Sequence, residues 1–410
     1  MSKRIAIIGA GVAGIAAARE LKRLQCEAIV LEARDRVGGR AFTEAQTFGM
    51  PIDRGCAYLH SAERNPLARY AQDHGFSVIE RSIRWRQRVG DREITSEDQQ
   101  RYYEAFQRYE SSIADAARAG RDVSAAEVVP CDKYRAQFDA VMGWLMGVDT
   151  EHVSTLDYDR YDNSDVNWPV LEGLGAVVAR SALGLDIRLR EQVRRIDWSG
   201  RSVRIESSGG VVEADAVIIT APTTVLATTP IDFSPALPGV YEDAFVHVPL
   251  GIANKVFFEF EPGQLPAGDM YHFVGSDRTA RTASYAIRPA GQELLLAYFG
   301  GGLARELEVG NALEQFAREE LASIFGADLI KHIRRATWTR WASDPFSCGS
   351  YSAAEPGYAH LREQLNVPIA GKIFFAGEAC SIRDFGTVHG AWFSGEGAAR
   401  AVAGETASAD

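Results

Sequence analysis

The sequence predicts an α/β fold, and three observations support this prediction. Residues 4–24 contain a short apolar segment, a glycine-rich turn and an alanine-rich segment, the order of a strand, a turn and a helix. Residues 373–400 repeat that order near the other end of the chain. Residues 184–219 form a series of short alternating apolar and polar runs, as half-buried strands do. Because single hydrophobic cores stop growing near about 250 to 300 residues, the length of 410 residues favours two domains.

The composition is that of a soluble globular protein, with 46% hydrophobic and 24% charged residues. The net charge of −11 argues against a nucleic-acid-binding surface and mildly favours cationic small ligands. The apolar run at residues 5–18 is interrupted by glycines and is too short to span a bilayer. We therefore expect neither a secretory leader nor a membrane anchor.

The cysteines indicate a reducing compartment. Their number is odd, and none has the CxxC or histidine spacing of a zinc site. They are Cys26, Cys56, Cys131, Cys348 and Cys380. Neither a disulfide framework nor a metal site is predicted, and a cytoplasmic location fits.

The first element is a dinucleotide-binding turn in the sequence GAGVAG. Gly9 makes the tight turn, Gly11 lets the backbone approach a pyrophosphate, and Gly14 permits close packing of the helix on the strand. Ala13 lies at the helix N-terminus, which faces the phosphates. Glu32 ends the second strand, where its carboxylate can accept both hydroxyls of an adenosine ribose and would repel a ribose phosphate. NADP is therefore disfavoured.

The next segment, LEARDRVGGR at residues 31–40, identifies the dinucleotide. Two glycines before an arginine allow a close turn that aims a guanidinium at a diphosphate. Here the sequence resembles the flavin amine oxidase family, and the resemblance implies that the cofactor is FAD. It also implies that Ala33, Arg34, Gly39 and Arg40 contact the FAD.

The resemblance implies two domains built from interleaved segments. A Rossmann-like FAD-binding domain of the GR2 type would comprise residues 1–75, 176–235 and 341–405. A mixed α+β substrate-binding domain would comprise residues 76–175 and 236–340. In the family, the valine that matches Val193 holds the adenine through its main chain.

Between these motifs, local patterns predict further elements. Thr95 and Asp98 fit a capping box at the start of a helix at residues 95–119. An SSGG sequence at residues 207–210 predicts a hairpin turn, and VIIT at residues 217–220 predicts a central strand. A further strand is predicted just before the helix, with a basic face formed by Arg84, Arg86 and Arg88.

The C-terminal signature IFFAGEACSIRDFGTVHGAWFSGEGAAR covers residues 373–400. A buried strand leads to Gly377, where the backbone can pass close to a ligand, and to Glu378, which can hydrogen-bond a polyol such as the ribityl chain. Thr387 and Val388 open a helix whose free N–H groups suit a reduced flavin. His389 is expected to be structural.

The segment RWASDPFSCGSYS at residues 340–352 resembles polyamine oxidases and flavin-dependent histone lysine demethylases. The resemblance implies that Trp341 packs beside the flavin and that Tyr351 forms one wall of an aromatic slot for the amine. Ser350 stands where monoamine oxidases have the cysteine that bonds the flavin, so non-covalent FAD is expected. Thr387 aligns with the second aromatic wall, which leaves the slot open as in the polyamine type.

NKVFFEF at residues 254–260 predicts a buried strand headed by a lysine. A buried ammonium is costly without a partner, and the family places such a lysine by a water at flavin N5. We therefore expect Lys255 to act in catalysis. GCAYLHSAERNP at residues 55–66 adds His60, which matches a substrate-facing histidine of polyamine oxidases. Ala57 and Tyr58 in the same motif are expected to contact the cofactor.

Together these motifs predict a cytoplasmic, FAD-dependent amine oxidase, a monomer or homodimer, that uses O2 and forms H2O2. A polyamine-like substrate is favoured, and residues 70–160, where the resemblance fades, are expected to encode substrate choice. No nucleic-acid or membrane partner is expected. The alternatives are an L-amino acid oxidase, with Arg84, Arg86 and Arg88 as candidates to bind the carboxylate, or a desaturase or dehydrogenase of the same fold.

Overall fold

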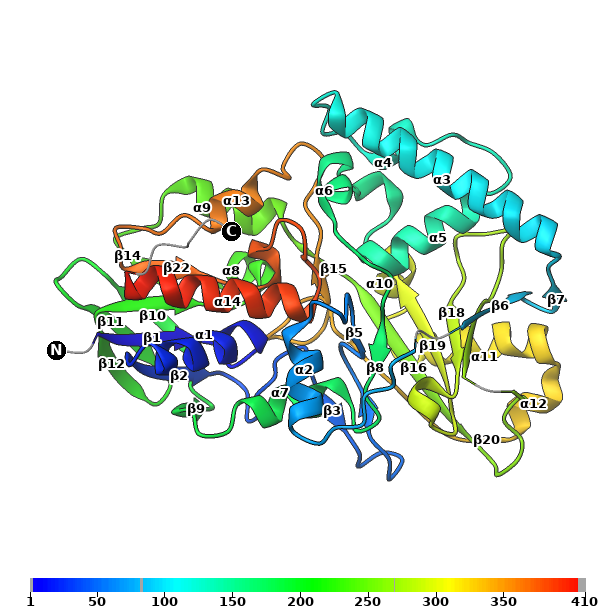
Figure 1. The fold of residues 1–410 in the computed structure, drawn as a ribbon, viewed down its shortest axis with the longest axis horizontal. Helices are drawn as coiled ribbons and strands as arrows, with labels where there is room; N and C mark the ends of the chain where they lie inside the picture. Colours follow the sequence, from blue (N-terminus) through cyan, green and yellow to red (C-terminus); the bar gives the residue numbers. More distant parts are fainter. Residues whose placement is uncertain (1–2, 82–83, 269, 405–410) are drawn as a thin grey trace.

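The computed structural model describes residues 3–81, 84–268 and 270–404. In these ranges the chain forms a parallel sheet, a larger and mostly antiparallel sheet, several small sheets, and helices packed around them (Figure 1). The structure is therefore a mixed α/β fold. No helix in the described ranges has the length and apolarity needed to cross a bilayer.

The parallel sheet contains the predicted strands at both ends of the chain. Its strands, in spatial order, are β22 (Ile373–Phe375), β13 (Ala216–Ile219), β1 (Arg4–Ile8), β2 (Glu27–Glu32) and β9 (Ile187–Leu189). Every pairing is parallel, and the four strands other than β9 are mostly buried and apolar, as strands covered on both faces are. The predicted strands at residues 4–8, 28–31, 217–220 and 373–376 are confirmed.

Helices cover one face of this sheet. Helices α1 (Val12–Arg23) and α14 (Val388–Ala403) lie side by side there, and α2 (Pro66–Asp73) and α7 (Leu174–Ser181) pack in the same core (Figure 1). The helices predicted after the two glycine motifs are confirmed. Helix α14 begins where Thr387 accepts a hydrogen bond from the N–H of Gly390.

A second core covers the other face. It includes a four-stranded sheet in the order β12 (Gly210–Ala214), β11 (Val203–Ser207), β10 (Val193–Asp197) and β14 (Asp232–Ser234). Residues 208 and 209 make the predicted hairpin turn between β11 and β12. The helices of this core are α8 (Thr223–Thr228), α9 (Gly239–His247) and α13 (Leu361–Leu365).

The larger sheet has seven strands. Their order is β20 (Ile333–Trp338), β16 (Ala253–Phe260), β19 (Leu294–Gly300), β18 (Ser284–Ile287), β17 (Tyr271–Val274), β6 (Arg84–Val89) and β7 (Arg92–Glu93). Every residue of β16 is buried, which confirms the strand predicted at residues 254–260. Helices α10 (Gly301–Glu306), α11 (Ala312–Phe325) and α12 (Ala327–Lys331) belong to this part of the fold. The predicted strand β6 is present, but the side chains of Arg84 and Arg86 lie outside the described residues.

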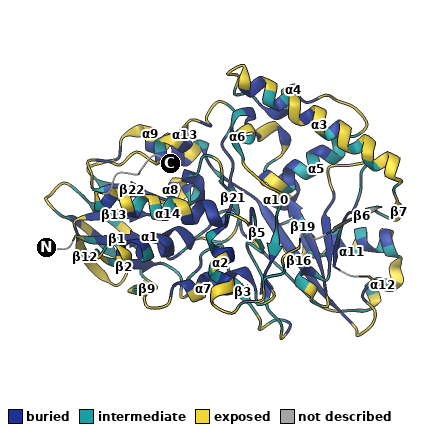
Figure 2. Cartoon of the chain, viewed as in Figure 1, coloured by how far each residue is buried: buried dark blue, intermediate teal, exposed yellow. Residues whose placement is uncertain are grey.

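Helices from the middle of the chain form a separate layer beside the seven-stranded sheet (Figure 1). They are α3 (Ser96–Arg118), α4 (Ala125–Val128), α5 (Arg135–Met146) and α6 (Thr155–Arg160). Thr95 caps α3 through the N–H of Asp98, as predicted. One face of α3 is exposed and the other is buried, as Figure 2 shows.

Three two-stranded sheets connect these parts. They are β3 (Thr43–Glu44) with β4 (Ile52–Asp53), β5 (Tyr58–Leu59) with β8 (Trp168–Pro169), and β15 (Leu250–Gly251) with β21 (Tyr351–Ser352). Short 3-10 turns occur at Thr150–His152, Pro289–Gly291 and Glu378–Cys380. Because β5 and β21 carry Tyr58 and Tyr351, these small sheets fix the position of predicted site residues.

Candidate active site

One large cavity runs from the carboxyl ends of the parallel strands to the face of the seven-stranded sheet. Its volume is about 580 Å³, within the range of roughly 300–1,000 Å³ usual for cofactor and ligand sites. All the residues predicted from the sequence to bind the cofactor or to act in catalysis line it, except Gly14. Residues as far apart as Gly9 and Val388 therefore face one space.

The glycine-rich turn leaves this cavity open at the start of α1. Gly9 has a φ of +102°, which favours glycine, and a Cβ on Gly14 would lie 1.9 Å from the oxygen of Gly9. A Cβ on Gly11 would meet nothing within 4 Å, and Gly11 caps α1 without a side-chain hydrogen bond. The first N–H groups of α1 are thus available to a phosphate, while Gly14 serves packing.

Glu32 lies at the end of β2, next to this turn. Its carboxylate accepts hydrogen bonds from the N–H groups of Ala10 (2.6 Å) and Arg34 (2.8 Å). These bonds fix the side chain, which is 5% exposed, and leave one lone pair on each oxygen for two hydroxyl donors. Val193, on β10, lines the same end of the cavity.

The predicted arginines are held by carboxylates. The Arg34 guanidinium pairs with Asp344 (Nη1 to Oδ2, 2.8 Å) and donates to the hydroxyl of Ser347 (2.9 Å). Arg40 donates from Nη1 to Glu378 Oε1 (2.7 Å) and to the main-chain oxygen of Ser350 (2.8 Å). Both guanidinium groups still line the cavity, so each can offer its remaining N–H groups to a diphosphate.

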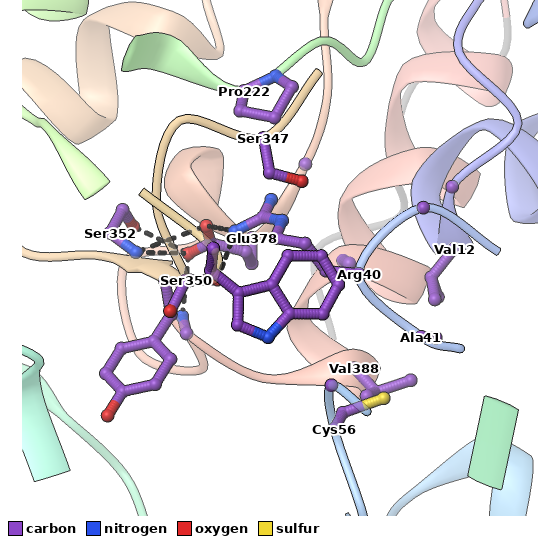
Figure 3. Close-up of a pocket in the computed structure, with 18 of the residues that line it drawn as sticks. Val12, Arg40, Ala41, Cys56, Pro222, Ser347, Ser350, Ser352, Glu378 and Val388 are labelled. Carbon is purple, nitrogen blue, oxygen red and sulfur yellow. Dashed lines mark hydrogen bonds and ion pairs between the residues drawn. The ribbon is translucent and has the colours of Figure 1, made fainter. Parts of the chain in front are cut away.

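Glu378 is the centre of a hydrogen-bond network on the cavity wall (Figure 3). Besides Arg40, its carboxylate accepts from the hydroxyl of Ser352 (2.6 Å) and from the N–H of Gly386 (2.8 Å). Burial raises the pKa of Glu378, but Arg40 and Ser352 outweigh this effect and hold the pKa below its usual value. Glu378, which was predicted to hydrogen-bond the ribityl chain, is thus bonded mainly to protein groups.

Figure 3 shows this network on one side of the cavity, with Val12 and Ala41 on the other side and Cys56 and Val388 below. The thiol of Cys56 lines the cavity, and burial, followed by the charge of Asp53, raises its pKa to about 12. A neutral thiol is a poor nucleophile. Cys348 does not line the cavity.

Lys255 projects from β16 into the cavity and is 8% exposed. Its Nζ donates to the main-chain oxygens of Asp53 (2.9 Å) and Gly55 (2.5 Å). Burial lowers the pKa of Lys255, while the nearby Asp53 carboxylate opposes that shift. The lysine is therefore buried rather than exposed at a strand end.

The Asp53 carboxylate fixes the loop whose oxygens hold Lys255. It accepts hydrogen bonds from the hydroxyl of Thr43 (2.5 Å) and from the N–H groups of Leu174 (2.9 Å) and Gly175 (3.1 Å) at the start of α7. Burial raises the pKa of Asp53, and Lys255 lowers it. Asp53 thus links the start of α7 to the lysine.

Tyr351 lies across the cavity on β21. Its hydroxyl donates to the main-chain oxygen of Trp144 (2.5 Å) and lies 3.0 Å from the hydroxyl of Tyr298. Tyr298 is the direct neighbour of Lys255 across the β16–β19 pair, so both side chains point to the same face of the sheet. Trp341, 7% exposed, donates from Nε1 to the oxygen of Arg54 (3.2 Å).

Two histidines and Tyr58 form a polar group beside these rings. His60 Nδ1 lies 2.6 Å from Asn167 Oδ1, and burial lowers the pKa of His60. His272 Nε2 lies 3.3 Å from the Tyr58 hydroxyl, and burial lowers the pKa of His272 to about 4. Both imidazoles are neutral at neutral pH and can accept or donate one hydrogen bond at each nitrogen.

Sequence reasoning missed part of this lining. Helix α5 contributes Trp144, Leu145 and Met146, while Tyr298 and His272 come from the large sheet. The α5 residues fall within residues 70–160, the region expected to encode substrate choice. No local pattern separates these side chains from core residues. Tyr298 is placed in the site by the strand register that sets it opposite Lys255.

Thr387 and His389 have partners in the protein. The Thr387 hydroxyl accepts from Gly390 and donates to the oxygen of Asp384 (2.6 Å), so it completes the turn before α14. His389 does not line the cavity, and its Nε2 lies 3.1 Å from Asp384 Oδ1. Thr387 supplies no second aromatic wall.

Of the three arginines considered for a substrate carboxylate, the structure describes the side chain of Arg88. Arg88 donates to the main-chain oxygens of Gly90 (2.8 Å) and Ile324 (3.4 Å), and it does not line the cavity. The side chains of Arg84 and Arg86 lie outside the described residues. Nor does the described part of the chain contain a cluster of three potential metal ligands.

Comparison with known proteins gives a consistent result. A family model described as flavin containing amine oxidoreductase matches residues 12–138 and 80–403. Polyamine oxidase 4 of Oryza sativa subsp. japonica is 28% identical, over 96% of this chain and 87% of the relative. Polyamine oxidase 2 of Arabidopsis thaliana is 29% identical, over 96% of this chain and 86% of the relative. Lysine-specific histone demethylase 2 of Homo sapiens is 27% identical, over 96% of this chain but 52% of its own length.

Solved structures share the fold. Cyclohexylamine oxidase from Brevibacterium oxydans IH-35A superposes with a TM-score of 0.82 at 21% identity, over 99% of both chains. A wild-type putrescine oxidase bound to putrescine superposes with a TM-score of 0.80 at 21% identity, over 97% of this chain and 98% of that chain. At this identity the superpositions establish the common fold.

Proposed function

Because the chain belongs to the flavin containing amine oxidoreductase family, we propose that it oxidises a primary or secondary amine to an imine. It is an amine-oxidising flavoprotein that uses FAD. The observation that carries the proposal is the single cavity that joins the glycine turn and Glu32 at one end to Lys255 and Tyr351 at the other. When bound, FAD supplies the redox chemistry by taking a hydride at N5 from the carbon beside the amine nitrogen and passing the electrons to O2, which gives H2O2.

The fit of FAD is supported by the donors and the free space along the cavity. The bare N-terminus of α1, Arg34 and Arg40 would hold the diphosphate, and Glu32 would hold the adenosine ribose. Val193 would face the adenine. The neutral thiol of Cys56 and the serine at position 350 support non-covalent binding.

The residues around Tyr351 would position the amine. Tyr351 and Trp341 present rings whose polar ends are tied to main-chain oxygens, so the ring planes are held in place before substrate binds. Lys255 would hold a proton and a water near the reacting carbon. His60, neutral and bonded to Asn167, would accept a hydrogen bond from the amine.

We also propose the finer organisation predicted from the sequence. The five-stranded parallel sheet and its helices would be the GR2-type FAD-binding domain, formed by residues 1–75, 176–235 and 341–405. Residues 76–175 and 236–340 would form the substrate domain. The protein would be a monomer or a homodimer. The five free cysteines support a cytoplasmic location, and the net charge of −11 argues against a nucleic-acid partner.

Two substrate classes have support. A polyamine is supported by the names of the relatives, several of which are polyamine oxidases. An apolar monoamine is supported by the lining around Tyr351, which is aromatic and aliphatic. An L-amino acid has less support, since Arg34, Arg40 and Arg54 are the arginines that line the described cavity and each already binds carboxylate or carbonyl groups of the protein.

The test is anaerobic mixing of the purified flavoprotein with benzylamine, putrescine, spermidine and L-leucine. Bleaching of the visible flavin band by at least one amine, followed by H2O2 release on admission of air, is the expected result. Bleaching by L-leucine alone would favour an amino acid oxidase instead. Absence of bleaching by every compound would refute amine oxidation.

A further inference from the structure

The part of the cavity around Tyr351, called here the amine pocket, has an apolar wall. Trp144, Leu145 and Met146 come from the end of α5, while Leu296, Tyr298 and Phe385 complete the wall. The hydroxyl of Tyr351 is hydrogen-bonded to the hydroxyl of Tyr298 and to the main-chain oxygen of Trp144, and the ring of Phe385 lies 5.0 Å from that of Tyr161.

Three carboxylates line the described cavity. They are Glu32, Glu191 and Glu378. Glu32 is bound by Ala10 and Arg34 at the end of β2, and Glu191 accepts from the hydroxyl of Ser207 (2.5 Å) and the N–H of Gly209 (2.9 Å). Glu378 is bound by Arg40, Ser352 and Gly386. Each is thus already engaged by protein groups.

Cationic side chains also line the described cavity. Lys255 lines the cavity beside Tyr298, and Arg54, one residue from the loop oxygens that hold Lys255, lines it too. Burial also lowers the pKa of His272 to about 4, because buried surroundings disfavour a positive charge. Among the described lining residues, a second ammonium would therefore find no carboxylate that is free of protein partners.

We propose that this site, given the amine oxidation proposed above, selects amines with one basic nitrogen on an apolar body and discriminates against diamines and polyamines. The reacting amine enters as the neutral base, so it loses its charge before it is buried. A second ammonium keeps its charge, loses water on entering the pocket and gains only the attraction of the aromatic rings, which is weaker than that of a carboxylate.

The first test compares two substrates that differ in one group. Hexylamine and hexamethylenediamine have the same chain length, but the diamine replaces the terminal methyl by an ammonium. The rate of anaerobic flavin reduction and the dissociation constant of each amine are measured by stopped flow. We expect the ratio of reduction rate to dissociation constant to be at least about tenfold higher for hexylamine than for the diamine, because the second ammonium loses water without gaining a partner. The same ratio should be higher for benzylamine than for spermidine.

Equal or better reduction by the diamine and spermidine would overturn this inference and leave amine oxidation standing. If no amine reduced the flavin, the proposed function itself would fail. The two failures are therefore distinguishable in the same experiment.

The second test supplies the missing carboxylate. Leu145 lines the cavity and is 38% exposed, so a polar replacement there is compatible with folding. In Leu145→Glu the preference for hexylamine over hexamethylenediamine should fall about tenfold relative to Leu145→Gln, which has the same size without the charge. Flavin content and thermal unfolding verify that both variants fold. An unchanged preference in Leu145→Glu would contradict the proposal that charge at this wall sets the selection.

Discussion

The ammonium of Lys255 lies 2.9 Å from the main-chain oxygen of Asp53, and the carboxylate of the same aspartate is tied to the first amides of α7. One residue thus holds the lysine by its backbone and acts on its charge through its side chain. Because burial disfavours the ammonium and Asp53 favours it, the proton on Lys255 depends on this pair. Three predictions concern it.

Lys255→Met is expected to slow reaction of the reduced enzyme with O2 about a hundredfold, the usual scale for loss of a positioned proton-transfer group. The matched control is Lys331→Met, since Lys331 is exposed on α12 and pairs with Asp328 there. Rapid mixing of the reduced enzyme with air-saturated buffer measures the rate. A rate within twofold of the wild type would remove Lys255 from the mechanism.

The difference in stability between Lys255→Met and the wild type is expected to depend on pH. Since the pKa of Lys255 in the folded protein is below its ordinary value of 10.5, the unfolded chain keeps a proton where the folded chain has lost it. The destabilisation caused by the buried lysine is thus fully present below the folded pKa and declines as the pH rises towards 10.5. Urea unfolding at saturating FAD should show the variant gaining most over the wild type at neutral pH. A gain that grows with pH would contradict this.

Asp53→Asn is expected to shift the alkaline limb of the O2 reaction to lower pH. The carboxylate raises the pKa of Lys255, so its removal lets the lysine lose its proton at a lower pH. Asparagine retains an acceptor for the amides of α7, which limits the loss of stability to about 1 kcal/mol. The measurement is the pH profile of the oxidation rate, with the exposed Asp328→Asn as control. A profile that does not move would separate Asp53 from the lysine.

Glu378→Gln is expected to weaken FAD binding by about tenfold or more. Arg40 would lose its carboxylate, and the amide cannot accept from Ser352, Gly386 and Arg40 at once. Loss of flavin fluorescence on titration of the apoprotein measures the affinity. Glu396→Gln, on α14 and outside the cavity lining, is the control. Equal affinities in the two variants would show that the network does not shape the flavin site.

The residues predicted to hold the cofactor could be picked out from the sequence because their signals are local. Gly9, Gly14 and Glu32 have their roles within one strand, turn and helix, and the positive φ at Gly9 requires no distant partner. Lys255 stands out for a similar reason, since a lysine in a buried apolar strand conflicts with its own surroundings.

The substrate half is different because its geometry comes from pairing between distant strands. Tyr298 belongs to an apolar run, and nothing in that run indicates that it lies opposite Lys255 and next to Tyr351. Trp144 contacts Tyr351 through its main-chain oxygen, and a contact made by the main chain leaves no pattern in the residue types. The preference for polyamines drawn from motifs therefore leaves out the wall contributed by α5.

Asp157→Asn is expected to destabilise the protein by about 3–5 kcal/mol, the cost of leaving a buried charge without its partner. Arg362 is fully buried and donates to Asp157 through Nε (2.6 Å) and Nη2 (2.9 Å). The same guanidinium donates to the main-chain oxygens of Ser352 and Ala379, so it ties α6 to the segments on either side of Glu378.

Asp157 is on α6 and Arg362 is on α13. A second ion pair between these two helices provides the control. Arg160 on α6 and Glu363 on α13 lie 3.1 Å apart, but the glutamate is 52% exposed, so Glu363→Gln should cost less than about 1 kcal/mol. Urea unfolding of both variants at saturating FAD measures the difference. Arg362, the partner of Asp157, also binds Ser352, and Ser352 donates to Glu378. Asp157→Asn should therefore also weaken FAD binding, whereas Glu363→Gln should not. Similar stabilities for the two variants would mean that the buried pair does not hold α6 against the flavin side of the cavity.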